Sequence, residues 1–295
     1  EQREAEATVR SAIDRGITLI DTAPIYGQGQ SEEIVGKAVA ESGRRDDLVL
    51  ATKVGLDWED GIRRDSSPER IRREVEDSLR RLRTDVIDIY QVHWPDAAVP
   101  FEETAATLQQ LREEGKIRSI GVSNYAPEEM ERFRDAATLD VLQPPYNIFE
   151  RGIEEQHLPY CREHGIAVLA YGALCRGLLA GTLREDSSFP KGDLRRNDPK
   201  FRSPRFAQYL AATAELDRWA REKHDVGVLE FAVRWLLDSG ADVALWGARK
   251  PSQLDRVSNV SGWKLAEVDM QEVDRILAAH IEDPVGPEFM APPEN

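Results

Sequence analysis

The stretch PERIRREVEDSLRRLRTDVIDIYQVHWPD, residues 68–96, contains the pattern that decides the fold. Its first part, 68–82, has apolar residues at helical spacing, and Pro68 after Ser67 suits the start of a helix. Its second part, 86–93, is a short apolar run rich in Val and Ile that ends in polar residues. Such a strand is typical of a parallel sheet that is covered by helices. This stretch therefore indicates an α/β protein.

The same alternation continues in both directions along the chain. We expect strands at 17–22, 48–53, 86–93, 119–123, 141–146, 167–171 and 243–247. We expect helices at 7–15, 32–41, 68–82, 102–114, 127–136, 153–164, 205–223, 228–238 and 252–258. Strands and helices in this order predict an α/β fold of the (β/α)8 TIM-barrel type.

Residues 1–295 are expected to form a single barrel domain. Only seven strand candidates are present, so we expect the first strand to lie before Glu1, in a missing segment of about 30 residues. The irregular segment 175–204 follows what would be the seventh strand of the barrel. A loop of this length in a compact domain is usually a lid or a binding loop.

Composition narrows the possible partners. The chain has 295 residues, 41% hydrophobic content and a net charge of -15, which argues against nucleic acid and against an anionic membrane surface. No run approaches the roughly 20 apolar residues of a membrane span. The 2 cysteines form no disulfide framework or zinc motif. We therefore expect a cytoplasmic protein with no metal; the sequence does not indicate its oligomeric state.

Polar residues stand at the ends of three consecutive predicted strands. Asp21 and Tyr26 follow the first, in LIDTAPIYG, Lys53 ends the second, and His93 ends the third. Each of these residues alone has an ordinary structural explanation, such as a turn or a packed ring. Together they lie at the face of a barrel where catalytic residues are found. We therefore interpret them as one site.

The four side chains suit the reduction of a carbonyl group. Hydride addition leaves an alkoxide, which needs a proton from a positioned acid. A free tyrosine has a pKa of about 10, and a nearby ammonium lowers that pKa by stabilising the phenolate. Tyr26, Lys53 and Asp21 supply the acid, the ammonium and a carboxylate that keeps the ammonium charged. A neutral His93 would polarise the substrate oxygen.

Seven motifs in the same order resemble the aldo-keto reductase superfamily. They are DTAPIYGQGQSEEIVGKAV, ATKVGL, IDIYQVHWPD, SIGVSNY, LQPPYN, AYGALCRGLLAG and WGARKPSQLD. In detail the chain is most similar to bacterial members that act on glyceraldehyde, glycerol and other small polyols. The resemblance implies a catalytic tetrad of Asp21, Tyr26, Lys53 and His93, with Tyr26 as the proton donor. It also implies reduction of aldehydes or ketones to alcohols by hydride from NADPH.

The resemblance further implies a cofactor site. Ser123, Asn124 and Gln143 would hold the nicotinamide carboxamide, and Tyr171 would stack on the ring. The following loop would cradle the pyrophosphate through the backbone amides of Gly172, Ala173, Leu174, Arg176, Gly177 and Leu178. Arg249 would bind the 2′-phosphate, which suits a planar guanidinium, with Gly247, Ala248 and Gln253 beside it.

Three positions depart from the family pattern. Gly172 stands where a serine is usual, Cys175 where a glycine is common, and Arg256 with Val257 where Glu-Asn is usual at the adenine end. These departures affect the cofactor contacts more than the reaction. Trp58 and Trp94 follow two adjacent strands and are candidates for the walls of a substrate pocket.

Two alternative functions remain open. A cofactor-binding regulatory protein with little or no turnover could use the same barrel, and the complete tetrad favours the enzyme over it. A hydrolase on the same barrel would need two carboxylates flanking a cleft at the strand ends. Asp21 is the one carboxylate found there, and its role is tied to Lys53. The expected ligands are thus NADPH and a small carbonyl or alcohol.

Overall fold

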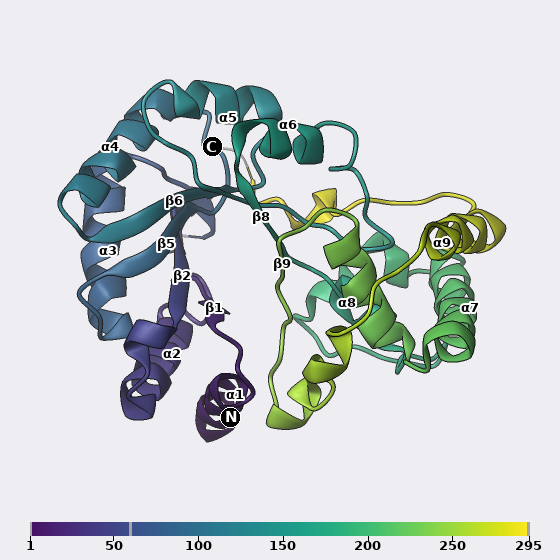
Figure 1. The fold of residues 1–295 in the computed structure, drawn as a ribbon. Coiled ribbons are helices and arrows are strands. Elements are labelled where there is room, and N and C mark those ends of the chain that lie inside the picture. The colour runs from purple at the N-terminus through teal and green to yellow at the C-terminus, as the bar shows by residue number, and fades with distance from the viewer. Residues whose placement is uncertain (1, 59–60, 294–295) are drawn as a thin grey trace.

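A computed structural model describes residues 2–58 and 61–293 of the chain. Its main sheet has seven parallel strands in the order β1-β2-β5-β6-β7-β8-β9 (Figure 1). The strands of this sheet have the same order in space as along the chain, as in a barrel wound in one direction. The strands are β1 (Leu19–Asp21), β2 (Val49–Val54), β5 (Ile87–Val92), β6 (Ile117–Ser123), β7 (Val141–Gln143), β8 (Ala167–Ala170) and β9 (Val243–Ala244).

Helices surround the curled sheet on its outer side (Figure 1). Helix α3 begins at Pro68, as the Ser67–Pro68 pair predicted. The Ser67 hydroxyl accepts a hydrogen bond from the backbone N–H of Arg70. Among the described residues, no helix is both long and apolar enough to span a membrane. The helices are α1 (Gln2–Asp14), α2 (Gln30–Ser42), α3 (Pro68–Leu82), α4 (Phe101–Glu113), α5 (Pro127–Arg134), α6 (His157–His164), α7 (Arg205–His224), α8 (Val228–Asp238) and α9 (Glu267–His280).

Strand periodicity separates the barrel interior from the layer under the helices. Ala51, Ile89, Val141 and Leu169 form a small buried cluster of their own, while most other apolar residues join one large core. Successive side chains on a strand point to opposite faces, so residues two apart share a face. The residue two positions after each of these four in the chain therefore also points into the barrel, near the carboxyl end of its strand.

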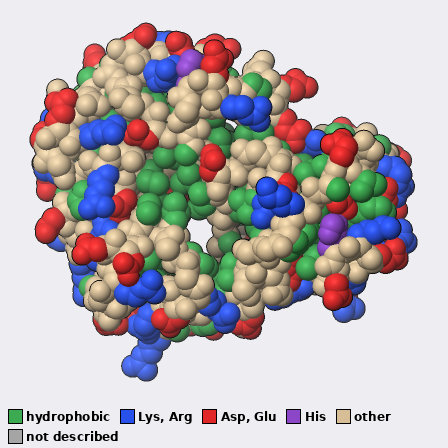
Figure 2. All heavy atoms as spheres, viewed as in Figure 1, with side chains coloured by type: hydrophobic (Ala, Val, Ile, Leu, Met, Phe, Trp, Pro, Cys, Tyr) green, Lys and Arg blue, Asp and Glu red, His purple; other side chains and the backbone are tan. Residues whose placement is uncertain are grey.

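The barrel is open between its two edge strands, β1 and β9 (Figure 1). A cleft of about 910 Å³ lies there, lined mainly by residues of α1, β1 and α2 on one side and of β9 and the segment after it on the other. Figure 2 shows hydrophobic side chains around a hollow between these two parts of the molecule. This curled, seven-stranded parallel sheet with helices on its outer side is of the (β/α)8-barrel type, which confirms the predicted fold class.

Several element boundaries differ from the prediction. The segment 252–258 forms two short 3-10 turns, η5 (Pro251–Leu254) and η6 (Val257–Val260), in place of one helix. Helix α9 was not predicted, although Val273 and Ile276 recur at helical spacing and are buried. A two-stranded hairpin of β3 (Leu56–Asp57) and β4 (Arg63–Arg64) follows β2 and was not predicted either.

The long segment 175–204 has structure of its own. It contains three 3-10 turns, η2 (Cys175–Ala180), η3 (Leu194–Arg196) and η4 (Pro199–Phe201). Phe189 packs against Phe201 and Phe206, with ring centroids 5.2 and 6.5 Å apart. This aromatic packing anchors the segment to the start of α7. After α9 the chain continues as a tail that includes the turn η7 (Glu288–Met290).

Candidate active site

The four residues expected to act in catalysis lie together at one end of the barrel. Asp21 is the last residue of β1, Lys53 lies near the end of β2, and His93 directly follows β5. Lys53 and His93 have the strand parity of the interior residues, so both point into the barrel. Tyr26 lies in the turn before α2, and its ring contacts the His93 ring edge-on, with centroids 5.9 Å apart. The structure thus brings the four side chains into one group.

Lys53 is a buried cation with one carboxylate partner. Its side chain is 1% exposed, and Nζ donates to Oδ2 of Asp21 at 2.6 Å and to the carbonyl oxygen of Thr22 at 3.1 Å. Burial alone lowers the pKa of a lysine. Here Asp21 and Tyr26 outweigh burial and raise the pKa of Lys53 above its ordinary value. Lys53 therefore stays protonated at neutral pH.

The tyrosine beside Lys53 is neutral. Burial raises the pKa of Tyr26, Lys53 offsets part of that rise, and Asp21 adds to it. The ammonium of Lys53 does lower the pKa of Tyr26, as expected. The net shift of that pKa is nevertheless upward, opposite to the prediction, because desolvation is the larger effect. The Tyr26 residue as a whole is 45% exposed. Nζ of Lys53 lies 5.4 Å from the centroid of the Tyr26 ring.

His93 is also neutral. Burial, together with the positive charge of Lys53, holds the pKa of His93 well below its usual range. A neutral imidazole has one N–H donor and one acceptor nitrogen. His93 can therefore donate a hydrogen bond to an oxygen without carrying a charge of its own, as the sequence analysis required.

Two glutamines extend this group. Gln143 was predicted to hold the carboxamide, but its contact with Asp21 was not predicted, and Gln91 was not predicted to take part at all. Nε2 of Gln143 donates to Oδ1 of Asp21 at 2.9 Å and to Oε1 of Gln91 at 3.2 Å. Nε2 of Gln91 donates to the same Asp21 oxygen at 3.3 Å. A Cβ at Gly121 would lie 2.6 Å from Cγ of Gln91, so only glycine leaves room for it. The only sequence feature that could have indicated a role for Gln91 is that an amide side chain stands within an otherwise apolar strand.

The residues expected to hold the nicotinamide form a connected set. Asn124 adopts a left-handed backbone conformation with φ of 64°, and its Nδ2 donates to the His93 carbonyl oxygen at 3.0 Å. Its Oδ1 accepts a hydrogen bond from the Tyr171 hydroxyl at 2.8 Å. Ser123 is buried and donates to the carbonyl oxygen of Gln143 at 2.8 Å. These contacts place the predicted set beside the catalytic group.

The loop after β8 has an unusual backbone. Gly172, Cys175, Arg176 and Gly177 all have positive φ values, of 73°, 44°, 53° and 96°. Non-glycine residues rarely adopt this conformation unless the surrounding structure holds them in it. A Cβ at Gly177 would meet no atom within 4 Å, so the loop faces open space there. Ala173, Leu174 and Leu178 belong to the same loop, which therefore fits a ligand that approaches the backbone closely.

The segment after β9 presents the predicted phosphate residue. Arg249 is exposed, and its backbone N–H donates to Oε1 of Gln253 at 2.7 Å. A Cβ at Gly247 would meet nothing within 4 Å. The pKa of Asp193 is lowered to about 2, first by a hydrogen bond from Arg195 and less by the charge of Arg249. Asp193 belongs to segment 175–204, so that segment approaches the predicted phosphate site. Ala248, also predicted to belong to the cofactor site, directly precedes Arg249 in the chain.

The two candidate pocket residues lie at the rim, each beside an arginine. Trp58 lines a small, tight cavity together with Lys53 and His93, and this cavity has no room for a water molecule. Arg70 lies 5.3 Å from the centroid of the Trp58 ring. Trp94 is not among the residues that line this cavity, and Arg64 lies 5.6 Å from its ring. Within the described ranges, no group of three or more potential metal ligands is present.

The comparisons with known proteins agree with this geometry. The model of the Aldo/keto reductase family matches residues 1–278. The chain belongs to the aldo/keto reductase family. It is 54% identical over 295 residues to an aldo-keto reductase, YhdN, of Bacillus subtilis (strain 168), covering 99% of this chain and 89% of the relative. This aldo/keto reductase is thus an oxidoreductase of a family that reduces carbonyl groups with nicotinamide cofactors.

Relatives with stated substrates or cofactors differ from one another. The glycerol dehydrogenase AKR11B4 of Gluconobacter oxydans has a TM-score of 0.90 and 52% identity, covering 98% of this chain and 89% of that chain. An NADH-specific methylglyoxal reductase of Escherichia coli (strain K12) is 36% identical, over 84% of this chain and 79% of the relative. An aldo/keto reductase from Klebsiella pneumoniae in complex with NADP and acetate has a TM-score of 0.75 and 28% identity, covering 97% and 88%.

Proposed function

We propose that this aldo/keto reductase reduces small polar aldehydes or ketones to alcohols, with NADPH as the hydride donor. The observation that carries the proposal is the charged, buried Lys53 beside the neutral Tyr26 and the neutral His93. Charge develops on the substrate oxygen during reduction, and these three groups meet around one position at the rim. Groups arranged in advance around a developing charge are a major source of rate enhancement.

Each residue has one task in this mechanism. The neutral His93 donates a hydrogen bond to the carbonyl oxygen and fixes its position. The Tyr26 hydroxyl then donates its proton to the alkoxide. Lys53 stabilises the tyrosinate that remains, and Asp21 keeps Lys53 charged and in place through the 2.6 Å contact. Gln91 and Gln143 hold Asp21 from its other oxygen.

A second set of residues would hold the cofactor, which supplies the hydride when bound. Ser123, Asn124 and Gln143 would bind the carboxamide, and Tyr171 would lie against the nicotinamide ring. The open backbone of the loop around Gly172 and Gly177 would receive the pyrophosphate. Exposed Arg249 would bind the 2′-phosphate and so favour NADPH over NADH. The NADH-specific relative makes this preference a point to measure rather than to assume.

The proposed substrate class is that of glyceraldehyde and related small polyols. Trp58 lies with Lys53 and His93 around one tight spot at the rim, and its rigid ring leaves little space there, which suits a short ligand better than one of several fused rings. The likeness to a glycerol dehydrogenase points the same way. An apolar ligand would also desolvate the charged groups at the rim, at a cost of several kcal/mol.

The decisive experiment is a fluorescence titration with NADPH and NADH, followed by turnover with a panel of carbonyl compounds. We expect NADPH to bind more tightly and kcat/KM to be larger for glyceraldehyde than for a bulky apolar ketone. A larger kcat/KM for the ketone would reject the polyol class and leave the reductase. Cofactor binding without any turnover would instead support the alternative, a regulatory protein on the same barrel.

A further inference from the structure

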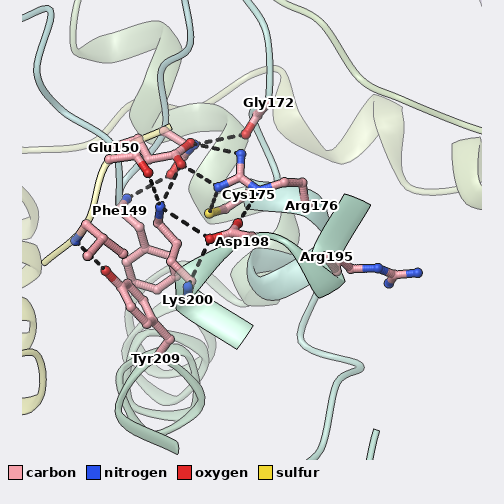
Figure 3. Close-up of polar contacts among 12 residues, drawn as sticks. Phe149, Glu150, Gly172, Cys175, Arg176, Arg195, Asp198, Lys200 and Tyr209 are labelled. Atoms are coloured by element: carbon pink, nitrogen blue, oxygen red, sulfur yellow. Dashed lines mark hydrogen bonds and ion pairs between the residues drawn. The ribbon is translucent and has the colours of Figure 1, made fainter. Parts of the chain in front are cut away.

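A second buried lysine lies on the other side of the cofactor loop, in a cluster of four charged side chains. Glu150 follows β7, Arg176 lies in η2, Asp198 precedes η4, and Lys200 lies within η4 (Figure 3). The side chains of Glu150, Asp198 and Lys200 are at most 1% exposed, and that of Arg176 is 11% exposed. We call these four residues the loop cluster.

The loop cluster fixes the strained part of the cofactor loop. Nη1 of Arg176 donates to Oε2 of Glu150 at 3.2 Å, Nη2 pairs with the other oxygen, and Nε donates to Oδ2 of Asp198 at 2.6 Å. All three nitrogens of the planar Arg176 guanidinium therefore pair with carboxylates of the cluster. Arg176 has a positive φ, which is unfavourable for its residue type, and these contacts hold it there. Asn147 joins the loop as well, since its Nδ2 donates to Glu150 and to the Gly172 carbonyl oxygen.

The same cluster also holds the C-terminal tail. Nζ of Lys200 donates to Oε1 of Glu150 at 2.8 Å and to the carbonyl oxygen of Gly286 at 3.0 Å. The Arg176 guanidinium lies 5.4 Å from the centroid of the Phe289 ring. One loop residue and one cluster lysine therefore each contact the tail.

The tail continues from the cluster to the substrate side of the rim. The carbonyl oxygen of Pro292 accepts a hydrogen bond from Nη2 of Arg64 at 3.0 Å. Arg64 in turn lies over the ring of Trp94, 5.6 Å from its centroid. A continuous chain of contacts therefore joins the cofactor loop, the loop cluster, the tail and a candidate wall of the substrate pocket.

We propose that the loop cluster is a positioning device that couples cofactor binding to the arrangement of the C-terminal tail. The side chains of Arg176 and Lys200 contact the other members of the cluster and the tail. They act by holding the backbone that receives the cofactor and the tail that reaches the substrate rim. This proposal rests on the proposed cofactor site, because the loop that is positioned is the one assigned to the pyrophosphate. The cluster contacts the cofactor loop and the tail contacts Arg64 at the substrate rim, so together they form a hydrogen-bonded and packed path between the two sites.

The first test measures binding and turnover in Lys200→Met, with Lys191→Met as the matched control. Lys191 lies in the same segment and is exposed, so the control makes the same chemical change outside the cluster. Lys200→Met is expected to raise the NADPH Kd about fivefold or more and to raise the glyceraldehyde KM, while kcat at saturation of both ligands stays within about twofold. Lys191→Met should match the wild type. A Kd and KM in folded Lys200→Met equal to those of the control would overturn the proposal.

A second variant covers the case in which Lys200→Met does not fold. Phe289→Leu keeps every charge of the cluster and removes only the ring that faces Arg176. It is expected to change the NADPH Kd and the glyceraldehyde KM in the same direction as Lys200→Met, by a smaller factor. An unchanged NADPH Kd in Phe289→Leu would show that the tail is not coupled to the loop.

Hydrogen exchange separates this proposal from the proposed function. Without any cofactor, Arg176→Lys is expected to speed amide exchange in peptides that cover the tail, 281–293, as well as in the loop. Exchange confined to the loop would reject the coupling whatever the enzyme does. If the wild-type protein binds neither NADPH nor NADH, the proposed function fails, and the exchange result still decides whether the cluster holds the tail.

Discussion

Two lysines in this reductase are almost completely buried, and their surroundings differ in one respect. Lys53 has a single carboxylate partner, Asp21 at 2.6 Å, and its next ionisable neighbour is the hydroxyl of Tyr26. Lys200 lies 2.8 Å from Glu150 and 3.9 Å from Asp198, and both of those carboxylates also pair with Arg176. The first lysine faces an accessible rim, whereas the second is enclosed.

This difference in pairing indicates which of the two buried lysines acts in catalysis and which one stabilises the fold. In the loop cluster two cations face two carboxylates, so every charge is compensated within the cluster. Around Lys53 the charge also acts on Tyr26, a residue that is 45% exposed and whose pKa the ammonium lowers in part. A buried charge that acts on an accessible proton donor is available for catalysis. A buried charge that is fully paired can only hold its neighbours in place.

The largest expected effect comes from removing the proton donor on the Lys53 side. Tyr26→Phe should lower kcat by roughly 10²- to 10⁴-fold, because the acid that protonates the alkoxide is lost. The NADPH Kd should stay close to the wild-type value, since the ring remains and only the hydroxyl is removed. Steady-state kinetics and a fluorescence titration check both statements. Turnover at the wild-type rate would remove Tyr26 from the mechanism.

The second prediction compares the two lysines directly. Lys200→Met should reduce the free energy of unfolding by about 3–5 kcal/mol, because it leaves a surplus buried negative charge. Lys53→Met should reduce it less, because the Asp21 side chain is 14% exposed and solvent can screen its charge, whereas the Glu150 side chain is 1% exposed. Urea unfolding of both variants measures the difference. Equal losses would mean that the two environments do not differ energetically.

A charge-balanced double variant sharpens this comparison. Glu150→Gln combined with Lys200→Met leaves Arg176 facing Asp198, one cation facing one carboxylate. It should recover part of the stability that Lys200→Met alone loses, because the uncompensated charge is gone. If the double variant is no more stable than Lys200→Met, the loss comes from packing rather than from charge.

The third prediction concerns the exposed charge at the cofactor site. Arg249→Ala should weaken NADPH by about 1.5–3 kcal/mol, or roughly ten- to hundredfold in Kd, because a charge-assisted contact to the 2′-phosphate is lost. The NADH Kd should hardly change, since NADH lacks that phosphate. Titration of one protein sample with both cofactors checks the prediction. Equal weakening of both would show that Arg249 does not distinguish them.

The smallest effect is a pH dependence from the layer behind Lys53. Burial, partly offset by Arg70, raises the pKa of Glu74 to about 7. The folded protein therefore binds more protons than the unfolded chain between a pH of about 4.5 and 7, so stability falls as the pH rises through that range. The expected loss between pH 6 and pH 8 is about 1 kcal/mol. In Glu74→Gln, Arg70 keeps Asp57 as a partner at 3.3 Å. Urea unfolding of this variant should show a smaller loss of stability between pH 6 and pH 8 than the wild type.

The sequence determined those features that depend on local periodicity. Strands and helices repeat with different periods, so the alternation of elements and the strand ends could be located without knowing any contact. Parallel strands place their carboxyl ends on one face, and this brought Asp21, Lys53 and His93 together in advance. The family motifs then assigned each of these residues a role.

Tertiary structure decided what depends on residues far apart in the chain. Lys200 stands in the irregular segment 175–204, where no periodic pattern indicates burial, and its partners Glu150 and Gly286 lie 50 and 86 positions away. The role of Gln91 and the net direction of the Tyr26 pKa were hidden for the same reason. Burial and pairing of a charge are set by all the groups that surround it, and those groups come together only when the chain folds.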